Sequence, residues 1–571
     1  MAVFFNGRLL TTPTSASAVN DDAMRNQNLG VGNVVALVGR SAAGKPKTAL
    51  RFGTPEQAKA ELIDGELLTA VQMAFDPSAE TGGPSEVIAI RVQPAEQAAL
   101  MLKAGAENVI SLKSTNYGQR ENLIKVKVEA GSLSGLRLTT QRGNDYYTQD
   151  NVGRAALSVH YTGGEATATM SITGTTVTLA APTGTEVAAI DLTLFPTVQE
   201  LVDRINLVPG FGADVLDNSY TRPALNGLDF VTAQDVKTAA HTVRADLQAA
   251  VDWFNSAREG FVTAERVAGA GKKPDVAAFQ FLAGGNDGTT TMDDWAEAFE
   301  MLQGVDVLWV TAVSPDPAIH AMVDTHVAFM SNQGQKERRA VCGTDLATSK
   351  DDAKAAAKVL NSDRASLVFQ GHYDYDASGK LVLYPAYMSA ARIAGAFAGV
   401  SPGTPLTNKN FKCRGLEFNL RNPTDTDEMI NAGVLCLEDT EDGYKIVRSI
   451  STWLINDNYN RVEQSTGVAL DFTVRSVRQA QKVLVGTKGN PINLSRAVSI
   501  AESTLRELAK AEPQGPGVLA GDANSPAYRN ITAVQEGDAI RLQFECSPVI
   551  PNNYILTTVY AVPYSGVATA A

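Results

Sequence analysis

The chain has few of the residues from which catalytic and metal centres are usually built. It contains four cysteines and five histidines in 571 residues. None of the cysteines forms a C-x-x-C pair, and they are too sparse for a disulfide framework. We therefore expect free thiols, a reducing compartment, and neither a cofactor nor a metal. The cysteines are Cys342, Cys413, Cys436 and Cys546.

A surplus of positive charge and long apolar runs are missing as well. The 49 Lys and Arg stand against 62 Asp and Glu, which gives a formal net charge of −13. Because an acidic surface repels phosphate, direct nucleic-acid binding is disfavoured. The longest apolar run, near residues 307–310, is far shorter than the roughly 20 residues of a membrane helix, so we expect no membrane insertion. The first residues, MAVFFNGRLL, lack a basic and a long apolar region, so we expect no signal peptide.

The apolar share and the length of the chain indicate a folded protein of several domains. Apolar residues make up 44%, which suffices for a sizeable core and excludes a disordered chain. At roughly 150 residues per domain, the length favours about three to four domains.

Strand and helix patterns alternate in two separate parts of the chain. The continuous apolar run at 34–39 is typical of a parallel strand covered on both faces, and Thr54-Pro55 predicts a helix over 55–75 before a strand at 87–92. This alternation predicts a doubly wound α/β domain over 34–110 plus 241–410. Its second half begins with a Thr291–Asp294 capping box and has strands near 305–313, 340–342 and 366–369 and helices near 316–330, 351–360 and 386–399.

The remaining segments differ in pattern. Residues 111–240 are rich in Thr, Val and Gly with period-two alternation and a helix at 198–205, which predicts an inserted β-rich outer domain. Residues 411–554 predict an α+β C-terminal domain with helices near 471–485 and 494–510. Segments 540–545 and 554–560 alternate, and we expect them to pair. Residues 1–33 and 555–571 are expected to be extended arms.

The segment Gly39 to Pro46 has the G-x-x-x-x-G-K spacing of a P-loop. A P-loop requires Ser or Thr after the lysine, because that hydroxyl binds magnesium. Here Pro46 follows Lys45, so a glycine-bounded turn is favoured over a nucleotide site.

Other clusters also favour a structural interpretation. Gly284, Gly285, Asp287 and Gly288 predict a tight turn before a helix, where Asp287 would repel a phosphate. His320, Asp324 and His326 cannot converge from one helix, since His326 is rotated by about 120° from the face of the other two. The sequence offers no constellation that indicates an enzyme.

Several Lys and Arg residues recur at helical spacing and form a basic stripe, although the chain as a whole is acidic. The stripe lies on the two predicted C-terminal helices, opposite apolar residues, and could bind an acidic partner, with a mixed solvated surface as the alternative. The first helix carries Arg475, Arg478 and Lys482, and the second carries Arg496, Arg506 and Lys510; the candidates for the contact are Arg475, Arg478, Lys482, Arg506 and Lys510.

The chain resembles the tail sheath proteins of contractile bacteriophage tails of the myovirus type. The resemblance is weakest over 111–240. The segments that carry it are 34–62 (VVALVGRSAAGKPKTALRFGTPEQAKAEL), 281–288 (FLAGGNDG), 384–410, 415–420 (GLEFNL), 430–452 and 531–560.

This resemblance implies a structural role in the virion. Sheath subunits form hexameric rings that stack helically around a tail tube, are assembled in the host bacterial cytoplasm, and meet baseplate and tail terminator proteins. The metastable extended sheath contracts and drives the tube through the bacterial envelope for genome delivery. The resemblance also implies that the terminal arms exchange strands with other copies and that the C-terminal domain faces the tube. The expected arm residues are Val3, Phe4, Phe5, Ile555, Leu556, Val559 and Tyr560, and the expected tube contacts are those of the basic stripe. Another tail or baseplate protein, and a P-loop-like enzyme, are the alternatives.

Overall fold

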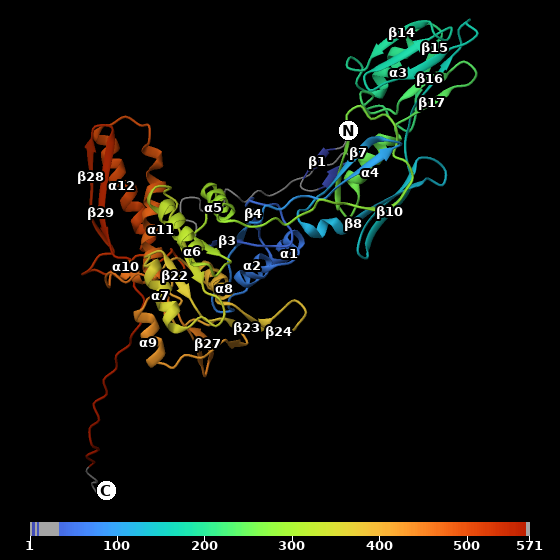
Figure 1. The fold of residues 1–571 in the computed structure, drawn as a ribbon. Coiled ribbons are helices and arrows are strands. Elements are labelled where there is room, and N and C mark those ends of the chain that lie inside the picture. The colour runs from blue at the N-terminus through green and yellow to red at the C-terminus, as the bar shows by residue number, and fades with distance from the viewer. Residues whose placement is uncertain (1–2, 6–7, 11–32, 567–571) are drawn as a thin grey trace, which may run out of the picture.

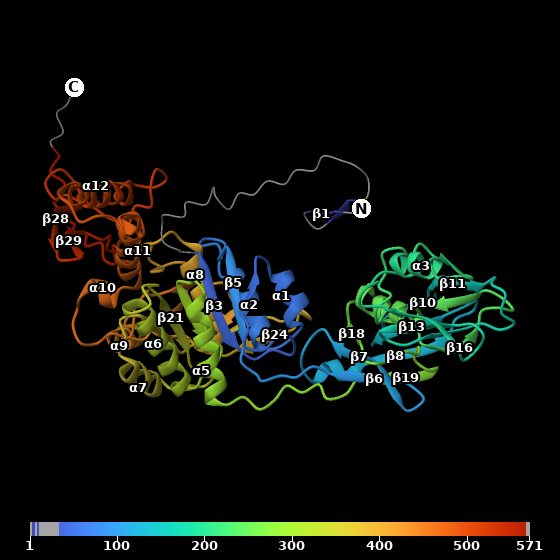
Figure 2. The ribbon, with the colours of Figure 1, turned by 90° about the horizontal axis from the view of Figure 1, so that it is seen from above.

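The computed structural model describes residues 3–5, 8–10 and 33–566. Figures 1 and 2 show a central α/β unit, two β-rich lobes on one side of it, and a C-terminal unit on the other side. No helix within these ranges is long and apolar enough to cross a membrane. Near the N-terminus, β1 (Val3–Phe5) and β2 (Arg8–Leu10) pair as an antiparallel hairpin.

The central unit is built on a sheet whose strands are β3 (Val34–Gly39), β4 (Leu50–Phe52), β5 (Glu86–Arg91), β20 (Trp309–Ala312), β21 (Arg339–Gly343) and β22 (Ala365–Val368). The strand order is β22-β21-β20-β3-β5-β4. All neighbouring strands are parallel except β4, which is antiparallel to β5. β20, β21 and β22 are buried along their whole length, as expected for strands covered on both faces.

The helices that cover this sheet are α1 (Pro55–Leu62), α2 (Glu66–Phe75), α5 (Met292–Met301), α6 (Pro317–Asn332), α7 (Lys350–Leu360) and α8 (Ala386–Gly399). On one face, α2 and α8 share a core with Leu37 and Trp309, and the rings of Trp309 and Phe397 stack with their centroids 4.2 Å apart. On the other face, α5 and α6 pack against Val38 and Ile90. The sheet therefore lies between two helical layers (Figure 2).

Local signals explain where these helices begin and end. The Thr54 hydroxyl accepts a hydrogen bond from the Gln57 N–H, and Pro55 occupies the first turn of α1. The predicted single helix over 55–75 is wrong: Ile63 and Gly65 have φ angles of 63° and 108°, which an α-helix does not allow. The Thr291–Asp294 capping box is present at the start of α5.

The β-rich insertion is wider than the predicted 111–240 and forms two lobes. The proximal lobe contains β6 (Ala99–Ala104), β7 (Glu107–Ser114), η2 (Gln119–Leu123), β8 (Ile124–Ala130), β9 (Leu136–Arg142), β10 (Asp145–Val152), α4 (Asp246–Ser256), β18 (Val262–Arg266) and β19 (Ala277–Phe281). Its sheets are β18-β7-β6 and β10-β9-β8-β19. Because β18 and β19 return to pair with β7 and β8, the insertion runs from about residue 99 to about residue 281.

The distal lobe has its own hydrophobic core. It contains β11 (Ala155–Tyr161), β12 (Thr169–Ile172), β13 (Thr176–Ala180), β14 (Glu186–Asp191), α3 (Val198–Asn206), β15 (Phe211–Val215), β16 (Val231–Asp235) and β17 (His241–Arg244). The sheets are β14-β13-β12-β16 and β15-β11-β17. The predicted helix over 198–205 is confirmed as α3, which a Thr197–Glu200 capping box begins.

The segment from 411 to about 450 packs with the central unit, although the sequence predicts it in the C-terminal domain. Leu435, Leu437 and Ile446 lie in the same core as α2 and α8. The elements after α7 that complete the central unit are β23 (His372–Tyr375), β24 (Leu381–Tyr384), β25 (Gly415–Leu416), α9 (Thr424–Asn431), β26 (Leu437–Thr440) and β27 (Gly443–Ile446).

The C-terminal unit contains α10 (Tyr459–Val462), α11 (Gln464–Gln481), η4 (Lys482–Leu484), α12 (Pro491–Leu508), β28 (Tyr528–Glu536) and β29 (Ala539–Cys546). A separate core that includes Phe472 and Leu505 joins α11, α12 and the hairpin. The predicted pairing of 540–545 with 554–560 is wrong, because β29 pairs with β28 instead. Residues 551–566 form neither helix nor strand, and the tail that follows Tyr554 extends away from the body (Figure 1).

Candidate assembly surfaces

The P-loop-like turn is filled by side chains of the chain itself. The Gly44 N–H donates to Asn116 Oδ1 at 2.6 Å, and the Ser41 N–H donates to Gln93 Oε1 at 2.7 Å. Arg91 Nη1 donates to the Gly44 carbonyl at 3.1 Å. The chain then runs into β4 rather than into a helix, so this turn lacks the helix N-terminus that binds phosphate in a P-loop.

The glycine turn at 284–288 lies against the same place. The fully buried Arg91 donates from Nη2 to Asp287 Oδ1 at 2.8 Å. Asn122 donates to the Gly285 carbonyl and accepts from the Gly285 N–H, both at 2.8 Å. Burial lowers the pKa of Arg91, and the Asp287 carboxylate opposes that shift. These contacts fasten the proximal lobe to the carboxyl edge of the central sheet.

We expect Asp287→Ala to lower the free energy of unfolding by about 3 kcal/mol, because it leaves a buried guanidinium without its counter-charge. Asp293→Ala is the matched control: Asp293 is exposed and forms no ion pair within the described ranges. Urea unfolding of both variants measures the difference. Equal midpoints would show that the Arg91–Asp287 contact does not stabilise this junction.

The structure corrects the predicted basic stripe on α11. Arg475 is 5% exposed and pairs with Asp306 just before β20. Arg478 pairs with Glu337 just before β21 and donates to the Gln335 carbonyl at 2.7 Å. Both arginines therefore face the central unit rather than solvent, because acidic residues from a distant part of the sequence lie opposite them.

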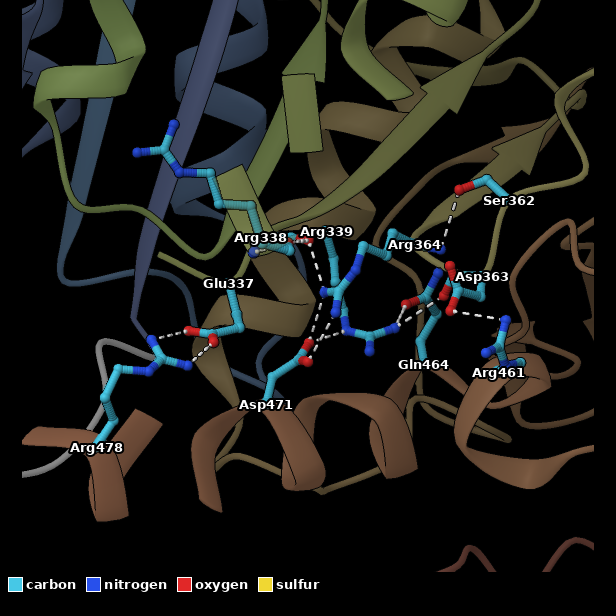
Figure 3. A network of polar contacts seen from close by, with 11 residues as sticks. Glu337, Arg338, Arg339, Ser362, Asp363, Arg364, Arg461, Gln464, Asp471 and Arg478 are labelled. Carbon is cyan, nitrogen blue, oxygen red and sulfur yellow. Dashed lines mark hydrogen bonds and ion pairs between the residues drawn. The ribbon is translucent and has the colours of Figure 1, made fainter. Parts of the chain in front are cut away.

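The same side of α11 also carries an acidic residue that pairs with arginines of the central unit (Figure 3). Asp471 accepts from Arg339 Nε at 2.9 Å and from Arg364 at 3.0 and 3.1 Å. Arg339 also donates to Gln464 Oε1 at 2.8 Å. Burial lowers the pKa of Arg339, while Asp471 opposes that shift. The C-terminal unit is thus attached to the amino ends of β20, β21 and β22 by ion pairs of both polarities.

The other predicted tube contacts lie at the surface of the C-terminal unit. On α12, Arg506 pairs with Glu502 at 2.8 Å, and Lys510, just after the helix, pairs with Glu507 at 2.7 Å, so that face is mixed in charge. Lys482 is exposed at the end of α11. Sequence reasoning missed one exposed cation nearby, Lys488, whereas Arg496, which lies on the predicted second helix, is exposed as well. The signal was present: no Asp or Glu occurs between residues 472 and 501. Tube contact by any of these residues stays a prediction.

The hairpin β28–β29 and the tail after it are both incompletely covered. The hairpin is a two-stranded sheet, so each of its strands has one edge that is unpaired within the described residues. In the tail, the predicted arm residues Ile555, Leu556, Val559 and Tyr560 are at least 83% exposed. Val3, Phe4 and Phe5 lie in β1, which pairs with β2; the rest of the predicted N-terminal arm, residues 11–32, lies outside the described residues.

The histidines singled out in the sequence are buried and hydrogen-bonded. His320 Nε2 lies 2.9 Å from the Ser314 carbonyl, and His326 Nε2 lies 2.7 Å from Arg338 Nη1. Burial lowers the pKa of His326 to about 3, so its ring is neutral and accepts from Arg338. In the part of the chain that the structure describes, no three His, Cys, Asp or Glu are grouped to hold a metal ion.

The fold is similar to that of solved sheath tail proteins. The structure matches the sheath tail protein of Listeria innocua with a TM-score of 0.52, at 12% identity, over 92% of this chain and 97% of that chain. No protein-family model matches the sequence.

Sequence comparison finds relatives that match nearly the whole length of the chain. The chain is 29% identical to the tail sheath protein of Bacillus phage SP01, covering 99% of this chain and 98% of that protein. It is 24% identical to the tail sheath protein of Staphylococcus phage Twort, covering 88% and 90%. The resemblance to bacteriophage tail sheath proteins is thereby confirmed: this chain is their homologue along nearly its entire length.

Proposed function

We propose that this chain is the structural subunit of a contractile phage tail sheath, located in the virion. Copies form hexameric rings that stack around a tail tube and contract to drive it through the bacterial envelope. The observation that carries the proposal is an exposed apolar tail on a chain whose C-terminal hairpin has two open edges. The homology to sheath proteins supports the same function.

The tail, residues 554–564, has the alternating pattern of a β-strand but pairs with no other strand among the described residues. In an extended conformation, successive side chains point to opposite sides, so Tyr554, Leu556, Tyr560, Val562 and Tyr564 share one face. All five are at least 75% exposed in the single chain. An exposed apolar segment beside an open sheet edge favours strand addition between copies. We therefore assign the tail, together with the N-terminal arm, to linking neighbouring subunits.

We assign the tube contact to the tip of the C-terminal unit, between η4 and the start of α12. Lys482, Lys488 and Arg496 are exposed there, and none of them forms an ion pair with another described residue. Val485 and Ile492, which are 81% and 77% exposed, lie in the same segment. A cationic surface with exposed aliphatic side chains suits an acidic partner. We do not assign Arg475 and Arg478 to the tube contact, because each already pairs with an acidic residue of the same chain.

Contraction in this proposal uses energy stored at assembly and needs no nucleotide. We expect the purified chain to bind no ATP or GTP in equilibrium dialysis, and Lys45→Ala to leave assembly unchanged, because Asn116 and Gln93 already occupy the N–H groups of the turn. Saturable nucleotide binding that Lys45→Ala removes would instead support the enzyme alternative.

Electron microscopy of the chain expressed alone tests the proposal. A sheath subunit with self-complementary arms assembles into tubes without other phage proteins. A chain that stays monomeric at high concentration would exclude this function.

A further inference from the structure

A groove between α5 and α6 is one of the most apolar hollows on the central unit. It has a volume of about 520 Å³ and is lined by residues that include Phe299, Met322 and Phe329. Of these lining residues, Phe329 is 41% exposed. A cavity of about 150 Å³ holds one benzene, so this groove has room for two phenyl rings.

The charge around the groove has one sign. From residue 274 to residue 335, the sequence contains no Lys and no Arg. Asp293 and Glu300 are exposed on α5 and lack an ion-pair partner in the described part of the chain. The cations that approach α5 are already engaged, since Lys47 pairs with Asp294 and Glu297 and Lys336 donates to the Gln303 carbonyl. The groove therefore fits a partner that combines apolar and cationic side chains.

The proximal lobe carries such a surface on β19, an edge strand of its sheet. Phe279 and Phe281 are 39% and 57% exposed. The Lys125 ammonium lies 4.6 Å from the centre of the Phe279 ring and 5.9 Å from that of Phe281, and the Lys127 ammonium lies 5.8 Å from the Phe279 ring. We call Lys125, Lys127, Phe279 and Phe281 the Phe–Lys edge.

We propose that the Phe–Lys edge of one copy docks in the α5–α6 groove of a second copy. The two phenyl rings enter the groove, and Lys125, which has no ion-pair partner among the described residues, faces Asp293 and Glu300, whereas Lys127 pairs with Glu129 of its own chain at 2.7 Å. The two surfaces belong to different units of the chain: Figure 2 shows β19 in the proximal lobe, well apart from α5 and α6 in the central unit, so neither covers the other among the described residues of a single copy. A contact between two different patches is heterologous and repeats from copy to copy, as a ring or a helical stack requires.

The inference rests on the proposed self-assembly but uses surfaces distinct from the tail and the hairpin. Cysteine cross-linking in assembled tubes tests it. Tubes are formed from a mixture of Phe281→Cys chains and Phe329→Cys chains and are then oxidised. We expect a disulfide-linked dimer in the mixture and none in tubes of either variant alone. Because the cysteines are on different chains, an intramolecular bond cannot mimic the result.

Charge reversal provides a second readout. We expect Lys125→Glu, combined with Phe281→Cys, to reduce the cross-linked fraction at least fivefold, and Glu300→Lys on the Phe329→Cys chain to restore it. Tubes that form but give no cross-link would overturn the docking proposal and leave the sheath function standing. A Phe329→Cys cross-link to Val485→Cys at the C-terminal tip would overturn it too, by giving the groove another occupant. Absence of tubes from the unmodified chain would instead contradict the sheath function itself.

Discussion

Asp471→Ala is expected to lower the free energy of unfolding by about 3–5 kcal/mol, the range for removing one partner of a buried ion pair. Asp471 lies between Arg339 and Arg364, whose side chains are 3% and 17% exposed. Without the carboxylate, two guanidinium groups remain close together in a poorly solvated junction. Urea unfolding followed by circular dichroism measures the loss.

The control for this variant is Glu502→Ala on α12. Glu502 also pairs with an arginine, Arg506, but its side chain is 48% exposed and that of Arg506 is 62% exposed. Exposed pairs contribute about 0–1 kcal/mol, so a small effect is expected. If Asp471→Ala were no more destabilising than Glu502→Ala, the ion-pair network would not hold the C-terminal unit to the central unit.

Deletion of residues 555–571 is expected to abolish tube formation while the chain stays folded. The deleted segment begins two residues after Asn553, whose side chain donates to Glu463 and anchors the chain to the body. The described deleted residues with large apolar side chains are at least 83% exposed, so their removal costs little core contact. Electron microscopy reports tubes, and the melting temperature reports folding.

Two matched double variants distinguish specific strand addition from non-specific hydrophobic association. Leu556→Ser with Tyr560→Ser changes the apolar face of the tail, whereas Thr557→Ser with Ala561→Ser changes the other face. We expect the first pair to prevent tubes and the second to permit them. A truncated chain that unfolds, or one that still forms normal tubes, would contradict the role of the tail as a linking arm.

The local elements of the central unit could be predicted from the sequence because their signals are local. The apolar run at 34–39 is β3, and the predicted helix over 386–399 is α8 with the same bounds. Capping residues such as Thr54 and Thr291 act within a few positions of themselves. Alternation in 540–545 also predicted a strand, which is β29, although it did not predict the partner of that strand.

The errors concern contacts between residues far apart in the sequence. Arg475 was assigned to a solvent-facing stripe because helical periodicity separates two faces without showing what lies against them. Its partner Asp306 is 169 positions away. The limits of the insertion were missed for the same reason, since β18 pairs with β7 across more than a hundred residues. Spacing alone showed that the P-loop pattern fails at Pro46, but it could not identify Asn116 and Arg91, which fill that turn.

In our proposal, copies of this chain assemble by exchanging strands through their tails. A cryo-EM reconstruction of the particles formed by the purified full-length chain would show where each tail lies. We predict hexameric rings stacked into a tube, in which residues 554–564 of one copy continue the β28–β29 sheet of another. Particles that remain monomeric at high concentration, or a tail that folds back on its own chain, would contradict it.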